Sequence, residues 1–468
     1  MVFSSLTFIY AFLPIVLVLY FICRNRIYRN VVLLIASLVF YAWCEPKLIL
    51  LMLAATLCAY AGGLLIARLD RREKAAAKKW VMAICVILML GVLFLFKYLG
   101  LFVSTIDAIV GGLPEFKQLA LPIGISFYTF QIISYIIDVY RCKVEAERNF
   151  FWLLLYVCLF PQLIVGPIVR YETVADDIRH RQESFGEFFE GLERFIFGLA
   201  KKVLISNTVA KLVTGIYGYG VGEAGTVFTW IATLAYTFQL YFDFSGYSDM
   251  ALGLGRMFGF HFRENFNYPY ASVSVAEFWR RWHISLGSWF RDYVYIPLGG
   301  NRVSRPRHLF NIMVVWGLTG FWHGAQWNFL IWGLYFGVLL VIEHFVLKKI
   351  LEKTPVIIKW AGTFFFVVVG RVFFYNESID AMWEVFRVLF TWVPGDFVTV
   401  MGSDTTMIPA LFVMPIAMLL SFPVFKPFVE SKGTLVSIIR MAVCAALFIL
   451  SIMFLLSSSY NPFIYFRF

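Results

Sequence analysis

The 468-residue chain is 61% hydrophobic and only 15% charged, and its formal net charge is +11. A soluble globular domain is roughly half apolar and a quarter charged, so this composition excludes that class and indicates a membrane protein. The excess positive charge gathers in short loops between apolar runs, which argues against nucleic-acid binding.

Apolar runs recur along the whole chain, and most approach the roughly 20 residues that a spanning helix needs. They are Thr7–Cys23, Leu48–Ala67, Trp80–Tyr98, Leu119–Val139, Phe150–Val169, Phe195–Leu212, Val227–Leu254, Trp327–Leu347, Val356–Phe374, Met407–Phe425 and Leu435–Leu456. Two shorter runs, Val31–Trp43 and Phe310–Phe321, suit tilted or re-entrant helices. We therefore predict an all-α polytopic membrane bundle of about eleven to thirteen transmembrane or re-entrant helices. No linker or internal repeat interrupts it, so residues 1–468 are predicted to form a single domain.

Charged loops predict how the chain is oriented in the membrane. Lysine and arginine cluster in five loops, Arg24–Arg29, Arg68–Lys79, Arg141–Arg148, Arg302–Arg307 and Lys348–Lys353. The positive-inside rule places such loops in the cytoplasm. The acidic loop Asn376–Thr405 is predicted outside, and so are the N- and C-termini. The first apolar run has no basic residues before it, so we expect an uncleaved anchor rather than a signal peptide.

The stretch Glu172–Ile196 is amphipathic rather than uniformly apolar. Phe185, Phe188, Phe189 and Leu192 recur on one side, and charged residues supply the other. A helix of this pattern is predicted to lie at the cytoplasmic membrane surface.

Polar residues interrupt the apolar run Val227–Leu254 between Asp243 and Asp249. They either line a polar cavity or hold helices together. We favour the second interpretation, in which the two aspartates pair with arginines.

The stretch Val273–Leu298 combines tryptophans at helical spacing with Arg280, Arg281 and Arg291. Arginine binds phosphate through two parallel hydrogen bonds, so these side chains are candidates for the phosphates of a coenzyme A donor. Contact with anionic lipid headgroups explains them equally well. His283 lies in the same stretch, either at a functional site or as a surface residue.

His323 lies between two apolar runs, in the sequence Gly320-Phe-Trp-His323-Gly. A titratable side chain at membrane depth is costly unless it faces a protein interior or a wet cavity, and imidazole transfers protons well near neutral pH. We interpret His323 as a general base that deprotonates an acceptor hydroxyl; an interhelical hydrogen bond is the alternative. Trp322 and Asn328 are further candidate substrate-binding residues, and Gly320 and Gly324 would let backbone and substrate approach closely. No cysteine or histidine spacing indicates a metal site.

Several long blocks resemble the membrane-bound O-acyltransferase family, and within it the bacterial alginate O-acetyltransferase branch. They are Leu121-Pro-Ile-Gly-Ile-Ser-Phe-Tyr, Ser134-Tyr-Ile-Ile-Asp-Val-Tyr-Arg, Phe160-Pro-Gln-Leu-Ile-Val-Gly-Pro, Gln239-Leu-Tyr-Phe-Asp-Phe-Ser-Gly-Tyr-Ser-Asp-Met, Glu277-Phe-Trp-Arg-Arg-Trp-His-Ile-Ser-Leu, Leu298-Gly-Gly-Asn-Arg and Trp322-His-Gly. The resemblance implies a central tunnel, a catalytic segment at residues 273–347, and His323 as catalytic histidine with His283 as its companion. It also implies no bound cofactor, acetyl-coenzyme A or another acyl thioester as donor, and a place in the inner membrane of a bacterium.

The expected activity follows from this resemblance. An acetyl group would pass from a cytoplasmic thioester across the membrane to an exported polysaccharide such as alginate, peptidoglycan or cellulose. An extracytoplasmic partner, an SGNH-type acetyltransferase or another polymer-modifying protein, would complete the transfer. The alternative is a transporter or flippase of an acylated or lipid-linked intermediate, but the paired repeats typical of transporters are not evident in the sequence.

The aromatic tail at residues 459–468 is predicted to lie outside the membrane. Its composition favours an aromatic belt at the interface. The tail also resembles the end of a small helper protein of teichoic acid D-alanylation. We therefore hypothesise that Tyr465 accepts the acyl group as a phenyl ester and passes it on.

Overall fold

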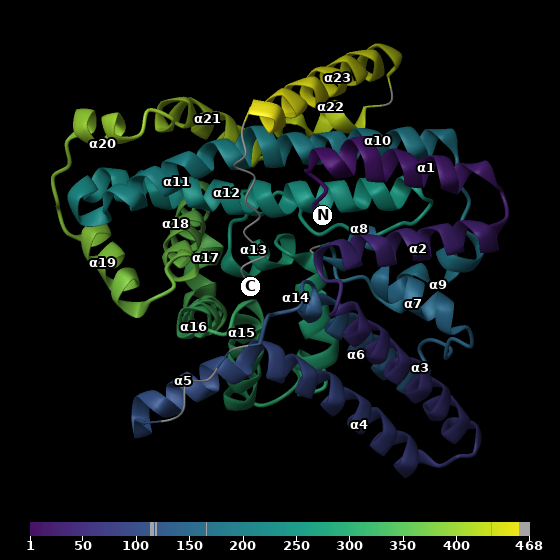
Figure 1. The fold of residues 1–468 in the computed structure, drawn as a ribbon. Coiled ribbons are helices and arrows are strands. Elements are labelled where there is room, and N and C mark those ends of the chain that lie inside the picture. Colours follow the sequence, from purple (N-terminus) through teal and green to yellow (C-terminus); the bar gives the residue numbers. More distant parts are fainter. Residues whose placement is uncertain (113–116, 118, 165, 432, 458–468) are drawn as a thin grey trace. The chain divides into compact units, whose positions relative to one another are not determined.

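The computed structural model describes residues 1–112, 117, 119–164, 166–431 and 433–457, and every regular element in these ranges is a helix (Figure 1). The prediction of an all-α protein is confirmed. The chain divides into two compact units. The first comprises Met1–Phe195 and Ser248–Arg263, and the second comprises Ile196–Tyr247 and Glu264–Phe468. Each unit is described by itself.

The first unit is built from the helices that come early in the chain. They are α1 (Leu13–Ile22), α2 (Arg26–Cys44), α3 (Ile49–Arg71), α4 (Ala75–Leu93), α5 (Leu99–Val110), α6 (Ile125–Tyr140), α7 (Phe150–Cys158), α8 (Phe160–Leu163), α9 (Tyr171–His180) and most of α10 (Phe185–Ala200). Helices α3, α4 and α6 pack against one another. Four phenylalanine rings from three elements fill part of the core, with centroids 5.4 to 6.3 Å apart; they are Phe8, Phe12, Phe40 and Phe160.

The amphipathic stretch forms two helices, α9 and α10, separated by a turn. In this turn, the Glu183 carboxylate forms ion pairs with Arg26 (2.6 Å) and Arg29 (2.7 Å) at the start of α2. On α10 the predicted apolar side is open, because Phe185 and Phe189 are 86% and 61% exposed. An aromatic face left uncovered beside a polar turn is consistent with a helix at a membrane surface.

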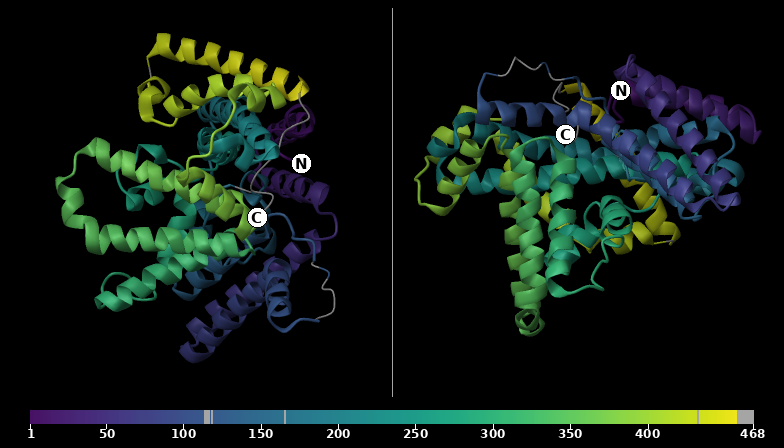
Figure 2. Two further views of the ribbon diagram at one scale, coloured as in Figure 1. Left: turned by 90° about the vertical axis from the view of Figure 1, so that its left-hand side faces the viewer. Right: turned by 90° about the horizontal axis from the view of Figure 1, so that it is seen from below.

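The second unit contains the helices that follow. They are α11 (Asn207–Tyr219), most of α12 (Val221–Met257), α13 (Val275–Arg281), α14 (Ile284–Phe290), α15 (Arg305–His323), α16 (Trp327–Ile342), α17 (Lys348–Lys353), α18 (Val356–Tyr375), α19 (Ile379–Phe390), α20 (Phe397–Ser403), α21 (Met407–Leu420), α22 (Lys426–Glu430) and α23 (Thr434–Ser457). Helices α15 and α16 form an antiparallel pair that α18 joins (Figure 2).

Six helical segments of the described chain are long and apolar enough to cross a membrane, or seven if the bent pair α20 and α21 counts as one span. They are Arg26–Cys44, Ile49–Arg71, Ala75–Val110, Trp327–Lys353, Val356–Tyr375 and Thr434–Ser457. This number is smaller than the number of apolar runs because several runs are divided in the structure. The run Phe150–Val169, for example, contains the short helices α7 and α8, which are separated at Leu159.

The two aspartates of α12 both form ion pairs. Asp249 contacts Arg194 at 2.9 Å, as predicted, within the first unit. Asp243 contacts Lys202 at 2.6 Å within the second unit, and both side chains are almost completely buried. A lysine is therefore a partner of Asp243, which the sequence analysis did not anticipate. Pairing offsets the cost of burying either charge alone.

Glycines bring α15 and α16 into close contact. A Cβ atom at Gly333 would overlap the carbonyl oxygen of Trp316, and one at Gly320 would overlap that of Phe329. A Cβ atom at Gly324 would likewise overlap the Phe329 ring. The predicted close approach of backbone is confirmed at Gly320, whereas the space beside both glycines is taken by α16 rather than left for a substrate.

We predict that Gly333→Ala destabilises the protein by about 1–3 kcal/mol, the usual range for an overpacked interface. Thermal unfolding of the purified protein in detergent, followed by circular dichroism, measures the loss. Gly317→Ala is the matched control on α15, because nothing lies within 4 Å of a Cβ atom there. Equal melting temperatures for the two variants would contradict the close contact described above.

Candidate active site

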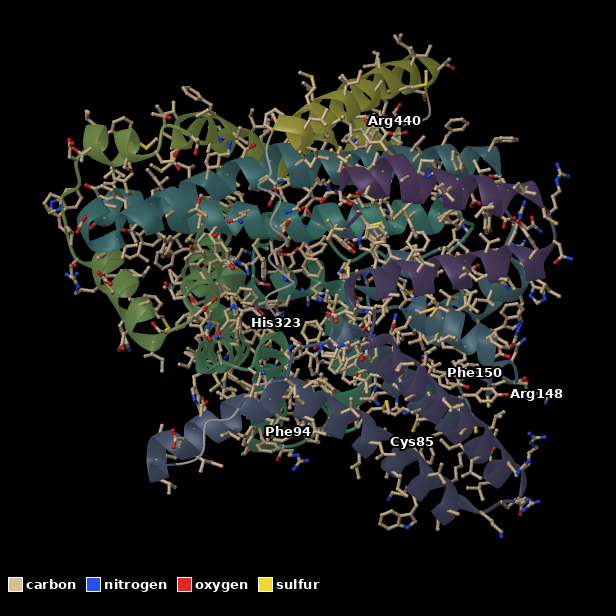
Figure 3. The ribbon with its side chains drawn as sticks, in the orientation of Figure 1. Cys85, Phe94, Arg148, Phe150, His323 and Arg440 are labelled. Atoms are coloured by element: carbon tan, nitrogen blue, oxygen red, sulfur yellow. The ribbon has the colours of Figure 1, made fainter. Side chains whose placement is uncertain are left out.

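His323, labelled in Figure 3, is the last residue of α15. A hydrogen bond to a backbone carbonyl group holds its ring. The Nδ1 atom lies 2.7 Å from the carbonyl oxygen of Thr319, one turn earlier. A carbonyl only accepts hydrogen bonds, so Nδ1 carries the proton and donates it. The basic lone pair of the imidazole is therefore on Nε2. Trp332 and Phe374 pack against the ring, with centroids 4.8 and 5.6 Å away.

His283 lies at the break between α13 and α14 and has left-handed backbone angles (φ 46°, ψ 53°). Its Nδ1 atom is 3.2 Å from Oδ1 of Asn265. The backbone N–H of Ser285 (3.2 Å) and its hydroxyl (2.8 Å) both donate to the same Asn265 atom. That atom must be the amide oxygen, so Nδ1 of His283 is also a donor. Its Nε2 atom is buried and has no hydrogen-bond partner in the described part of the chain.

The two histidines lie close together around Trp322. The indole ring of Trp322 is 5.9 Å from the His283 ring and 5.0 Å from the His323 ring, centroid to centroid. Burial lowers the pKa of His283 well below its ordinary value, and the neighbouring His323 lowers it further. His283 is therefore neutral at neutral pH and can accept a proton at Nε2.

Helix α13, which leads to His283, is fixed at its start by two glutamates. Ser274 accepts the N–H of Glu277 at 3.0 Å, and the Glu277 carboxylate accepts the N–H of Val273 at 2.9 Å, a variant of the capping box. Glu343, just after α16, accepts the N–H groups of Val275 and Ala276 at 2.6 and 3.1 Å. A carboxylate at a helix N-terminus is favourable, so these contacts tie α13 to α16.

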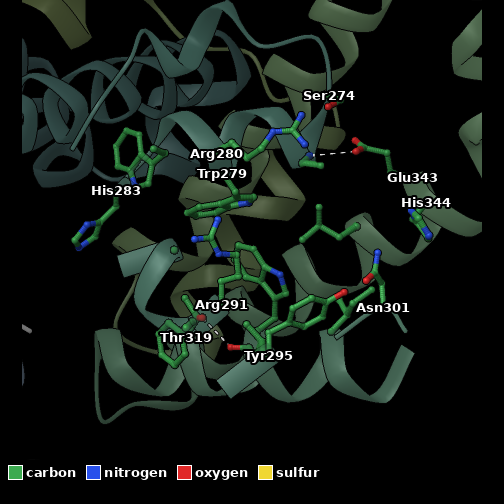
Figure 4. Close-up of a pocket in the computed structure, with 18 of the residues that line it drawn as sticks. Ser274, Trp279, Arg280, His283, Arg291, Tyr295, Asn301, Thr319, Glu343 and His344 are labelled. Carbon is green, nitrogen blue, oxygen red and sulfur yellow. Dashed lines mark hydrogen bonds between the residues drawn. The ribbon is translucent and has the colours of Figure 1, made fainter. Parts of the chain in front are cut away.

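A cavity of about 790 Å³ connects the histidine pair with a basic region of the second unit (Figure 4). His283, Thr319 and His323 line one part of it, and His308 and His344 line another. His308 and His323 lie near opposite ends of α15, so the cavity follows this helix for roughly 22 Å at 1.5 Å per residue. Four lysine or arginine side chains line it against two glutamates; they are Arg280, Arg291, Lys348, Lys359, Glu343 and Glu352. The cavity therefore suits an elongated ligand with an anionic end.

The predicted substrate-binding residues occupy different places. Arg280 lines the cavity. Arg281 forms an ion pair with Glu277 at 2.6 Å and is not part of the lining. Trp322 contacts both histidine rings but is not among the residues that line the cavity. The amide of Asn328 donates to the carbonyl groups of Phe373 and Asn376 at the end of α18, which is a structural role. Tyr465 lies outside the described residues.

Sequence analysis missed several residues that complete the site. Asn265 precedes His283 by a loop and a helix, and no motif connects the two. Thr319 reads as an ordinary helical residue, although its position four residues before His323 signals a contact within one turn. His308 and His344 lie beside basic loops, so in the sequence they look like further members of those loops rather than residues of a site. In the described ranges, no group of three histidine, cysteine or acidic side chains is placed to hold a metal ion.

The fold and the site together define a multi-pass membrane enzyme with a histidine-centred cavity. Residues 79–374 match the MBOAT, membrane-bound O-acyltransferase family, and the chain belongs to this family. It is 39% identical to a probable alginate O-acetylase AlgI of Pseudomonas putida, with both chains covered completely. It is 44% identical to the protein of that name in Pseudomonas aeruginosa, over 84% of this chain and 75% of the relative. A Helicobacter pylori peptidoglycan O-acetyltransferase is 33% identical over 83% and 79% of the two chains.

Family membership confirms the resemblance found in the sequence and makes the protein an O-acyltransferase. It sets aside the interpretation as a transporter or flippase without chemistry of its own.

We predict that His323→Ala lowers the rate of O-acyl transfer by roughly 10²–10⁴, the usual loss when a general base is removed. Transfer by purified protein in detergent measures the rate, and the amount of folded protein should not change. His283→Ala should also be slower, whereas His180→Ala, at an exposed position on α9, is the matched control. A His323→Ala variant that transfers acyl groups at the wild-type rate would rule out this assignment.

Proposed function

We propose that the protein transfers an acetyl group from a cytoplasmic thioester to an exported polysaccharide, alginate or a related glycan such as peptidoglycan or cellulose. The relatives' names support a polysaccharide acceptor. The single observation that carries the proposal is the cavity that joins a basic region to two buried imidazoles with basic Nε2 atoms.

The reaction needs one base and a path for one proton. Nε2 of His323 removes the proton from an acceptor hydroxyl as its oxygen attacks the thioester carbonyl. The tetrahedral intermediate then collapses, the carbon–sulfur bond breaks, and the imidazolium returns the proton to the leaving thiolate. His283 stays neutral beside His323, so it adds no positive charge that would oppose protonation of the base.

The charge distribution supports entry of the donor from the cytoplasm. Lys348 and Asn301, which line the cavity, lie in or beside loops that the positive-inside rule places there. A charged coenzyme cannot cross the roughly 30 Å hydrocarbon layer, so only the acetyl group would pass through. In this proposal the protein lies in the inner membrane with both termini outside, and acetyl-coenzyme A is the expected donor. An extracytoplasmic SGNH-type acetyltransferase or similar partner completes the transfer to the polymer.

We predict that Arg280→Gln and Arg291→Gln each raise the KM for acetyl-coenzyme A by about tenfold, because each removes a charge-assisted bond to phosphate. The same variants should leave the KM for acetyl-N-acetylcysteamine unchanged, since this thioester has no phosphate. Initial rates with both donors provide the measurement.

Arg281→Gln is the matched control for these two variants, because Arg281 is paired with Glu277 beside the cavity lining rather than in it. If all three variants behave alike, or if the two donors are affected equally, Arg280 and Arg291 do not bind the donor's phosphates. Contact with lipid headgroups would then explain them.

The first acceptor hydroxyl, we propose further, is that of Tyr465 in the aromatic tail. An unperturbed tyrosine has a pKa of about 10, so it needs a base such as His323 to react near neutral pH, and a phenolate is a good leaving group for onward transfer. We predict that Tyr465→Phe, which keeps the ring and removes the hydroxyl, abolishes acetylation of the polymer in cells. Wild-type acetylation in this variant would favour the aromatic belt at the membrane interface.

A further inference from the structure

Arg371 is a fully buried cation that takes no part in the reaction proposed above. It lies on α18 and is 1% exposed. Among the described residues no acidic side chain forms an ion pair with Arg371, and its Nε atom is buried without a hydrogen-bond partner. Its Nη2 atom donates a long bond, 3.5 Å, to the hydroxyl of Tyr270. An unpaired charge in a protein interior is costly, so a purely structural role would favour an apolar residue here.

Aromatic rings take the place of a counterion. The Cζ atom of Arg371 is 4.5 Å from the ring centroid of Trp282 and 5.9 Å from that of Phe278. The rings of Phe278 and Trp282 are themselves stacked, 5.6 Å apart with an interplanar angle of 22°. A planar guanidinium stacks on such a surface, whereas a lysine ammonium cannot do so as a plane.

Trp282 directly precedes His283 at the break between α13 and α14. The left-handed backbone of His283 is disfavoured for any side chain with a Cβ atom, so neighbouring contacts must hold it. Two backbone hydrogen bonds hold it to the segment around Asn265. The N–H of Ile284 donates to the carbonyl oxygen of Asn265 at 3.0 Å, and the N–H of Asn267 donates to the carbonyl oxygen of Arg281 at 3.0 Å. The stacked guanidinium of Arg371 supplies a further contact, through Trp282.

The same helix also reaches the other histidine. Phe374 follows Arg371 by three residues on α18, so the two side chains lie on one face. The Phe374 ring packs against His323 at 5.6 Å, centroid to centroid. One face of α18 thus contacts His323 directly and His283 through its neighbour.

We propose that Arg371 is a positioning residue for acyl transfer, which holds the indole of Trp282 and thereby sets His283 relative to His323. The proposal rests on these histidines being the catalytic pair. It makes the buried charge a functional feature that is kept in spite of its effect on stability.

Arg371→Met tests this proposal, because it keeps the length of the side chain and removes the charge. We expect kcat to fall about 10- to 100-fold, the scale of a small misplacement of a catalytic group, with the KM for the thioester donor unchanged. The melting temperature should stay the same or rise, since a lone buried charge is removed. Trp282→Leu should lower kcat similarly, and the double variant should be no slower than either alone. Arg387→Met, at an exposed arginine on α19, is the control.

Several results would overturn the proposal. A wild-type kcat for Arg371→Met is one, and a loss of activity that only follows a loss of folded protein is another. A raised KM for the thioester donor with kcat unchanged would instead make Arg371 an anion-binding residue. If Arg371→Met does not accumulate, Arg371→Lys decides the matter, because it keeps the charge but not the planar stacking and should still lower kcat. If Arg371→Met has wild-type activity while His323→Ala is inactive, the positioning role of Arg371 is rejected and the catalytic role of His323 still stands.

Discussion

A buried imidazole must have a partner for its N–H group, and this requirement organises the second unit. Both histidines satisfy it with an acceptor on the Nδ1 side, the carbonyl of Thr319 for His323 and the amide oxygen of Asn265 for His283. Each acceptor selects the tautomer in which Nε2 is basic. Burial keeps the His283 imidazole neutral, because a protonated ring would be poorly solvated there.

The helix breaks follow from the same requirement. His283 needs Asn265 at its Nδ1 atom and Trp322 beside its ring, and a continuous helix through residues 275–290 would not provide the left-handed turn that its backbone adopts. Glutamates at the start of α13 and the Asn265–Asn267 backbone hold this turn. Close packing of α15 and α16 through glycine then fixes the position of His323 at the end of α15. The reactive centre thus contains a left-handed backbone at His283 and buried polar groups, as is common in enzymes.

The sequence predicts those parts of the site that depend on composition. His323 and His283 stand out because polar side chains are rare in apolar runs, and Arg280 because it accompanies tryptophans at helical spacing. Parts that depend on tertiary contacts are not predictable in this way. No sequence motif connects Asn265 with either histidine. Lys202 lies within the apolar run Phe195–Leu212, and the sequence does not show that it pairs with Asp243. Gly320 predicts a close approach, but only the structure shows that the approaching group is the backbone of α16 rather than a substrate. Arg371 lies in a run that otherwise reads as a plain membrane span, and only its contacts show that it packs against the neighbour of His283.

The central claim is that the histidine pair moves an acetyl group from a donor on one side of the membrane to a hydroxyl acceptor on the other. Purified protein in liposomes, given labelled acetyl-coenzyme A on one face and an impermeant hydroxyl acceptor on the other, tests it most directly. The account predicts that label reaches the acceptor only when the donor is on the face that carries the loop Arg302–Arg307, and that none crosses without the His323 imidazole. Transfer from either face alike, or label crossing without that imidazole, would contradict it.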